Sequence, residues 1–230
     1  TPRSSCPKCK KPVAWYDNIP VLSFVILKGK CRGCQAPISW RYPLVELTMA
    51  LVFVLLGWSV GWKWTLVEYL IFAFGLVTIT FIDLDHYIIP DVFTLSGIVI
   101  GLVGSIINPE REFLTAFYGV LMGGGFLWLI AYLYLVVRKQ DGMGGGDIKL
   151  LAWIGAVLGW PSIPFVILAS SVVGAIVGLV LMRKSSEGLK TVLPFGPFLA
   201  LGSVFYLLGG YKLAYQYLVL FFPWLAPFDI

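Results

Sequence analysis

Long uncharged stretches separated by short polar segments dominate the chain after residue 41. Apolar runs cover residues 47–62, 64–82, 92–109, 113–137, 150–182 and 191–211, and an aromatic-rich apolar tail covers residues 213–228. A helix needs roughly 20 mostly apolar residues to cross the hydrocarbon core of a bilayer. The run 150–182 is too long for one crossing, and Gly159-Trp160-Pro161 supplies a break because proline ends a helix. The pattern predicts an all-α bundle of about seven transmembrane helices plus the apolar C-terminal segment.

The first 41 residues have a different character. They hold all four cysteines, eight of the 17 Lys and Arg residues, and a single acid, Asp17. Their prolines and glycines favour turns over long helices. We therefore divide the chain into a small polar domain, residues 1–41, and a transmembrane domain, residues 42–230. No internal repeat is visible in the sequence.

The distribution of charge predicts how the chain crosses the membrane. Only 13% of the residues are charged and 59% are hydrophobic, whereas a soluble domain carries about 25% charged residues. Segments 1–41, 83–91, 138–149 and 183–190 hold 14 of the cations, and the loops between the other span ends hold three. Cytoplasmic loops of membrane proteins carry such an excess. The net charge of +5 therefore indicates orientation in a lipid bilayer, with the cysteines in the cytoplasm, and not a nucleic-acid partner.

Two C-x-x-C motifs lie in the polar domain, Cys6-Pro7-Lys8-Cys9 and Cys31-Arg32-Gly33-Cys34. Four thiolates in two such pairs are typical of a zinc site. Two disulfides are the alternative, but the inferred cytoplasmic location disfavours them. We predict one structural zinc ion, because a segment this small lacks a hydrophobic core and gains its folding energy from a metal.

Three acids gather where one apolar run ends and the next begins, in the segment Phe81-Ile82-Asp83-Leu84-Asp85-His86-Tyr87-Ile88-Ile89-Pro90-Asp91. Carboxylates at membrane depth mark function by default. Asp83 is the deepest of the three, and Asp85, two residues away, faces nearly the opposite side of a helix. Asp91 follows Pro90 at the start of an apolar helix, which predicts an N-cap.

A second acid follows a glycine-rich loop, in Asp141-Gly142-Met143-Gly144-Gly145-Gly146-Asp147-Ile148-Lys149. Glycines permit close backbone approach, so Gly144, Gly145 and Gly146 are candidates for a supporting loop. The predicted topology puts Asp83 and Asp147 at the same cytoplasmic membrane face. Two carboxyl groups that share a proton are the chemistry of aspartic proteases. A flexible loop that ends in a capping aspartate is the alternative.

The order of these segments resembles the type IV prepilin peptidases, which are G-x-G-D membrane aspartyl proteases. The resemblance extends over nearly the whole chain and includes Arg41-Tyr42-Pro43-Leu44-Val45-Glu46 and Pro194-Phe195-Gly196-Pro197. It implies that Asp83 and Asp147 are the catalytic pair. It also implies substrates with a short basic leader before an apolar helix, namely prepilins or pseudopilins of type IV pili or type II secretion, cut at the cytoplasmic face of the bacterial inner membrane.

Members that carry the cysteine segment often have a second activity. They methylate the new N-terminal amine with S-adenosylmethionine. No glycine-rich nucleotide loop is visible in this sequence, so for this chain the methyltransferase activity and its cofactor are implied by the resemblance alone.

Two other functions remain open on the sequence. A membrane transporter would explain acids among helices, but these acids lie at one face of the predicted bundle. A zinc-dependent membrane scaffold without catalysis would leave both aspartates dispensable.

Overall fold

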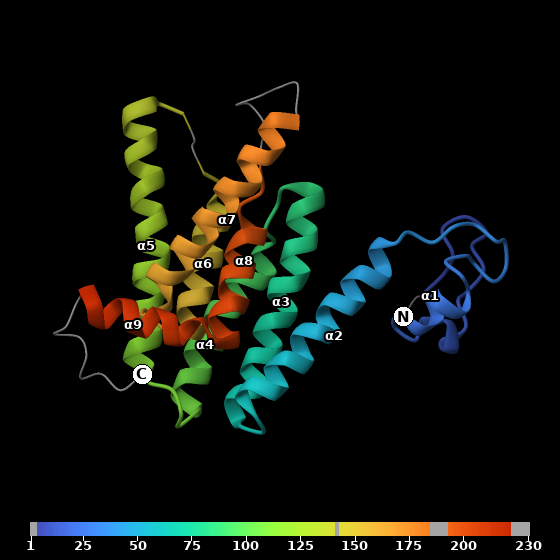
Figure 1. Ribbon diagram of the computed structural model, residues 1–230, viewed down its shortest axis with the longest axis horizontal. Coiled ribbons are helices and arrows are strands. Elements are labelled where there is room, and N and C mark those ends of the chain that lie inside the picture. Colours follow the sequence, from blue (N-terminus) through green and yellow to red (C-terminus); the bar gives the residue numbers. More distant parts are fainter. Residues whose placement is uncertain (1–3, 141–142, 185–192, 222–230) are drawn as a thin grey trace. The chain divides into compact units, whose positions relative to one another are not determined.

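The structure, a computed structural model, describes residues 4–140, 143–184 and 193–221. Every regular element in these ranges is a helix (Figure 1), which confirms the predicted all-α class. The chain divides into two compact units, residues 1–54 and 55–230. The boundary falls inside the helix α2, Arg41–Val60.

The first unit is a small loop-rich fold that precedes and includes the start of α2. Its short helices are a 3₁₀ turn η1, Trp15–Asn18, and α1, Leu22–Ile26. The side chain of Glu46 in α2 accepts a hydrogen bond from the backbone N–H of Val21, the N-cap of α1, over 2.7 Å. Arg32 donates two hydrogen bonds to Asp17, of 2.8 and 2.7 Å. These hydrogen bonds between residues distant in sequence stabilise the first unit, which has few buried apolar side chains.

The second unit is a bundle of apolar helices. They are α3 (Trp64–His86), α4 (Asp91–Ile107), α5 (Phe113–Arg138), α6 (Gly145–Leu158), α7 (Ser162–Lys184), α8 (Gly196–Phe205) and α9 (Tyr211–Phe221), with a π-helical turn η3 (Tyr206–Gly210) before α9. The predicted break is present, because α6 ends before Gly159, whose φ is 78°. The predicted tail from residue 222 onward lies outside the described residues.

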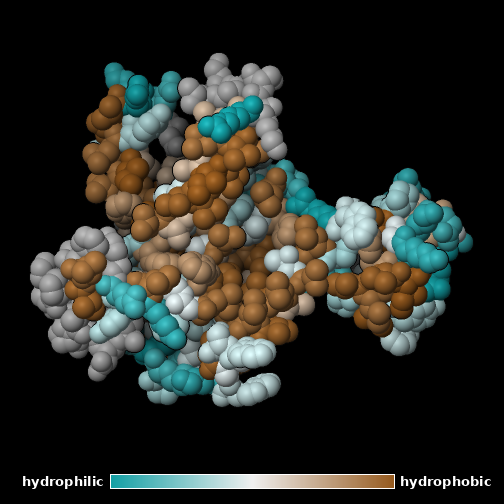
Figure 2. All heavy atoms as spheres, viewed as in Figure 1, coloured by the Kyte–Doolittle hydropathy of each residue, from teal (hydrophilic) through white to brown (hydrophobic). Residues whose placement is uncertain are grey.

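Among the described residues, five helical segments are long and apolar enough to cross a membrane. They are α2, α3, α5, α7 and the segment Gly196–Gln216. Apolar side chains face outward over much of the surface (Figure 2), as lipid contact requires. The helices α4 and α6 occupy two of the predicted spans but have only 17 and 14 residues.

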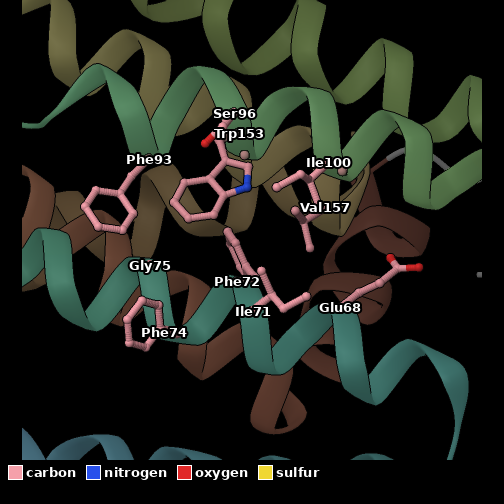
Figure 3. Close-up of a pocket in the computed structure, with 12 residues that line it drawn as sticks. Glu68, Ile71, Phe72, Phe74, Gly75, Phe93, Ser96, Ile100, Trp153 and Val157 are labelled. Atoms are coloured by element: carbon pink, nitrogen blue, oxygen red, sulfur yellow. The ribbon is translucent and has the colours of Figure 1, made fainter. Parts of the chain in front are cut away.

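The helix α6 lies at the centre of the bundle, and residues 150–157 are all buried. It packs mainly against α5 and α4. Small residues permit this: Gly119 of α5 and Gly155 of α6 meet backbone to backbone. On the other side of α6, the ring of Trp153 lies against Gly75 of α3 and Gly97 of α4 and stacks edge-on against Phe72 at 5.1 Å (Figure 3). Close packing therefore fixes the position of the helix that begins beside Asp147.

A buried polar network lies at the first turns of α3, far along the helix from Asp83. Arg111, in the α4–α5 loop, forms an ion pair with Glu68 of α3 and donates to the carbonyl oxygen of Ala156 over 2.5 Å. The side-chain amide of Asn108 donates to Glu68 over 3.1 Å. Arg111 thus satisfies a carbonyl in the last turn of α6, where a cation is favoured by the helix dipole.

Candidate active site and metal centre

Asp83 lies near the end of α3 and is almost fully buried, with 5% of its surface exposed. It faces the start of α8. A Cβ atom built on Gly196, the first residue of α8, would lie 2.7 Å from Asp83 Oδ2, so backbone and carboxyl group are in direct contact. The free N–H groups and the positive end of a helix dipole favour an anion at such a helix start. The N-terminus of α8 therefore offsets the unfavourable position of Asp83 at the end of its own helix.

Asp147 lies in the first turn of α6, three residues after its N-cap, Gly144. It is partly buried, and the charge of Asp83 acts on its carboxyl group. The two aspartates come from segments 64 residues apart in sequence, and the fold brings them within electrostatic reach. That the two form a catalytic pair stays a prediction.

Ile89 joins the two sides of this site. A Cβ atom built on Gly146 would lie 2.8 Å from Ile89 Cβ, and one built on Gly196 would lie 3.0 Å from Ile89 Cδ1. Ile89 thereby fills the space between the glycine that precedes Asp147 and the glycine that contacts Asp83. Of the three predicted loop glycines, Gly146 alone is tightly packed; nothing lies within 4 Å of a Cβ on Gly145.

Each aspartate has one buried oxygen without a hydrogen-bond partner among the described residues, Asp83 Oδ2 and Asp147 Oδ1. Buried polar atoms in native proteins are nearly always hydrogen-bonded, because leaving one unsatisfied is unfavourable. Two such oxygens, on carboxyl groups within electrostatic reach of each other, indicate a site whose polar partner is water or a substrate. The apolar pocket between α3, α4 and α6 (Figure 3) includes neither aspartate.

The other acids of the first motif lie outside this site. Asp85 is exposed. Asp91 is the first residue of α4, whose N-cap is Pro90 and has no side-chain cap bond, so the predicted capping role of Asp91 is wrong. Instead, Lys149 donates to both oxygens of Asp91, over 2.7 and 2.9 Å. This pair ties the start of α4 to the first turn of α6, a partnership that no local pattern in the sequence could indicate.

The four cysteines of the first unit form a cluster. Their sulfur atoms all lie within 4.8 Å of one another, and Cys6 Sγ and Cys34 Sγ are 3.8 Å apart. A tetrahedral site with Zn–S bonds of about 2.3 Å separates its sulfur atoms by about 3.8 Å, so the cluster has the dimensions of such a site. Backbone N–H groups of Cys9 and Lys8 lower the pKa of the Cys6 thiol to about 6. The pKa of the Cys34 thiol is lowered by the backbone N–H of Ala36 but raised more by desolvation and the neighbouring thiols, to about 11, so the metal site is supported by the positions of the sulfur atoms and not by these shifts.

The two cysteine motifs have the same backbone fold, an internal repeat that the sequence reading missed. In the first, the Cys6 N–H donates to Lys11 O and the Lys10 N–H to Cys6 O; in the second, the Cys31 N–H donates to Ala36 O and the Gln35 N–H to Cys31 O. Lys10 and Gln35 both have positive φ, 58° and 56°. An isolated β-bridge closes each loop, from Ser5 to Pro12 and from Lys30 to Pro37. Two equivalent knuckles therefore present two thiols each to a shared centre.

Comparisons with known proteins agree with this arrangement. Residues 1–60 match the bacterial peptidase A24 N-terminal domain, and residues 70–179 match the type IV leader peptidase family. No solved structure matches the chain.

Similar proteins include prepilin leader peptidase/N-methyltransferases from three bacteria. The chain is 39% identical to the protein of Pseudomonas aeruginosa over 94% of this chain and 75% of the relative. It is 41% identical to that of Aeromonas hydrophila over 96% and 76% of the two chains, and 38% identical to that of Legionella pneumophila over 88% and 71%. The membrane-capable helices and these similarities confirm a membrane enzyme and the resemblance inferred from the sequence, and they favour it over a transporter or a scaffold. The chain belongs to the type IV leader peptidase family.

Proposed function

We propose that this chain removes the short basic leader from type IV prepilins or pseudopilins with Asp83 and Asp147 as its catalytic pair. The observation that carries the proposal is the pair of buried, unpartnered carboxyl oxygens on these two residues. One carboxylate takes a proton from the attacking water while the other, protonated, polarises the scissile carbonyl group. The contacts of Gly196, Ile89 and Gly146 hold the two groups in place.

The peptide bond is cut at the cytoplasmic face of the bacterial inner membrane. The excess of cations in the loops that carry Asp83, Asp147 and the cysteines supports this orientation. Reporter fusions test it. Green fluorescent protein fused after Gln140 should fluoresce, which would place Gln140 in the cytoplasm. Alkaline phosphatase, an enzyme that is active only outside the cytoplasm, should be active when it is fused after Asn108. The reverse result at both positions would overturn the orientation.

The chain has two domains with different roles. Residues 1–41 hold one structural zinc ion through Cys6, Cys9, Cys31 and Cys34, and residues 42–230 form the aspartyl peptidase domain. The dimensions of the sulfur cluster and the two equivalent knuckles support the metal site. The names of the relatives support a second activity, methylation of the new N-terminus with S-adenosylmethionine.

Cleavage of a synthetic prepilin segment, followed by mass spectrometry, tests the proposal. The protein in detergent should release the leader, and addition of S-adenosylmethionine should add a methyl group to the shortened peptide. Asp83→Asn and Asp147→Asn should each abolish cleavage, whereas the matched variant Asp85→Asn should retain it, because Asp85 lies outside the site. Full activity in either of the first two variants would refute the two-aspartate mechanism. Methylation of a pre-cleaved peptide separates the second activity from the first.

A further inference from the structure

The short helix α1 presents an apolar face that the first unit does not cover. Leu22, Val25 and Ile26 are 51%, 65% and 63% exposed, and their spacing places them on one side of the helix. Ile19, which precedes α1, is also exposed. We call these four residues the α1 face. Figure 2 shows apolar side chains gathered on one side of the first unit.

The position of this face along α2 is fixed by a hydrogen bond. The N-cap of α1, Val21, donates to the side chain of Glu46, which is five residues into a membrane-capable helix that begins at Arg41. At a rise of 1.5 Å per residue, Glu46 lies about 7 Å along α2. The α1 face therefore lies at the level of the first turns of a transmembrane helix, where a bilayer surface begins.

The residues next to α1 have the character of a membrane interface. Leu44 and Leu47 of α2, at the same level, are more than half exposed, as are Trp40 and Tyr42 at the helix start. Trp and Tyr are enriched where a bilayer meets water. Exposed apolar side chains thus occur both on α1 and on the first turns of α2.

The positive charge of the segment around α1 favours contact with anionic lipids. Residues 4–40 contain six cations and one acid, Asp17, and that acid is already paired with Arg32. Lys28 and Lys30, directly after α1, are exposed. Lysines beside an embedded apolar face are attracted to anionic headgroups.

We propose that α1 is an interfacial anchor: its apolar face lies among the acyl chains, and Lys28 and Lys30 bind the headgroups of anionic phospholipids. The anchor holds the cysteine unit against the bilayer. This contact is independent of the proposed peptidase chemistry, and it would hold whichever aspartate activates water.

Photo-cross-linking in lipid nanodiscs tests the anchor with the full chain. Benzoylphenylalanine replaces Ile26, or Val99 of α4 as a matched lipid-facing control; Val99 is 60% exposed on an apolar helix. Correct folding is checked by an unchanged elution volume in size-exclusion chromatography and an unchanged thermal unfolding midpoint. Position 26 should form lipid adducts, and their yield should rise at least about two-fold when phosphatidylglycerol is included, an effect that Lys28→Glu with Lys30→Glu removes. Position 99 should form adducts independently of lipid charge.

Three results would overturn the proposal. The first is a lipid adduct at position 99 but none at position 26, which would leave the α1 face in water. The second is an adduct yield at position 26 that is the same with and without phosphatidylglycerol, which would exclude an anionic partner. The third is an adduct formed only with an added prepilin segment, which would assign the α1 face to the substrate instead of the lipid.

Discussion

The carboxyl group of Asp83 lies directly against the backbone of Gly196, so that a Cβ atom at position 196 would come within 2.7 Å of Asp83 Oδ2. This contact joins the end of α3 to the start of α8, helices that are more than 100 residues apart in sequence. A carboxyl group buried at the end of a helix is unfavourable by itself. The contact therefore shows how the fold accommodates a buried acid that we propose to be catalytic.

Gly196→Ala should reduce cleavage by about 100-fold, because a displacement of a reacting group by about 1 Å is enough for such a loss. The variant should still fold, since the added methyl group meets the end of a side chain. Gly125→Ala is the matched control: it adds the same methyl group to a helix where nothing lies within 4 Å, and it should keep full activity. Initial cleavage rates of the two variants decide the point, and equal rates would contradict the role of Gly196.

Asp147→Asn should lose activity without losing stability. The substitution removes the charge of a partly buried carboxyl group that the charge of Asp83 repels, and the isosteric amide leaves the packing unchanged. Thermal unfolding followed by tryptophan fluorescence in detergent should show an unchanged or higher midpoint. Leu150→Ala is the comparison, because Leu150 is fully buried and its truncation should lower stability by about 2–5 kcal/mol. A midpoint for Asp147→Asn as low as that of Leu150→Ala would mean that Asp147 is structural.

The purified chain should contain about one zinc ion, as a single four-thiolate site requires. Cys31→Ser should lose the metal, and Lys8→Ala, a change beside a ligand, should keep it. Because the cysteines belong to a separate compact unit, hydrogen exchange in Cys31→Ser should increase within residues 4–40 but not in α6. Metal content by elemental analysis and exchange by mass spectrometry check these outcomes. A native protein without zinc would refute the site.

Arg111→Met should destabilise the bundle by about 3–5 kcal/mol, since it leaves the Glu68 carboxylate buried without its partner. The double variant Glu68→Leu with Arg111→Met should recover much of this loss, because an apolar pair needs no compensation. Unfolding midpoints of the single and double variants measure the difference. A double variant no more stable than Arg111→Met would show that the unpaired Glu68 carboxylate is not the cause of the loss.

The cysteine motifs and the helical segments could be predicted because their signals are local. Apolar runs of membrane length, the break at Gly159 and paired C-x-x-C motifs each lie within a short stretch of sequence. The alternation of cations between spans also puts Asp83 and Asp147 at one end of the bundle, and their pairing in catalysis stays a prediction. Sequence alone thus determined the fold class, the membrane location and the candidate acids.

Tertiary structure decided the remaining relationships. The contact of Asp83 with Gly196, the position of Ile89 between two glycines and the pair of Asp91 with Lys149 all join distant segments. Local propensity placed Asp91 at a helix start and predicted a cap, but a lysine on a neighbouring helix lay within reach of its carboxylate. Such partners depend on how closely helices approach and how they are rotated, and small residues such as Gly119 and Gly155 fix both through packing.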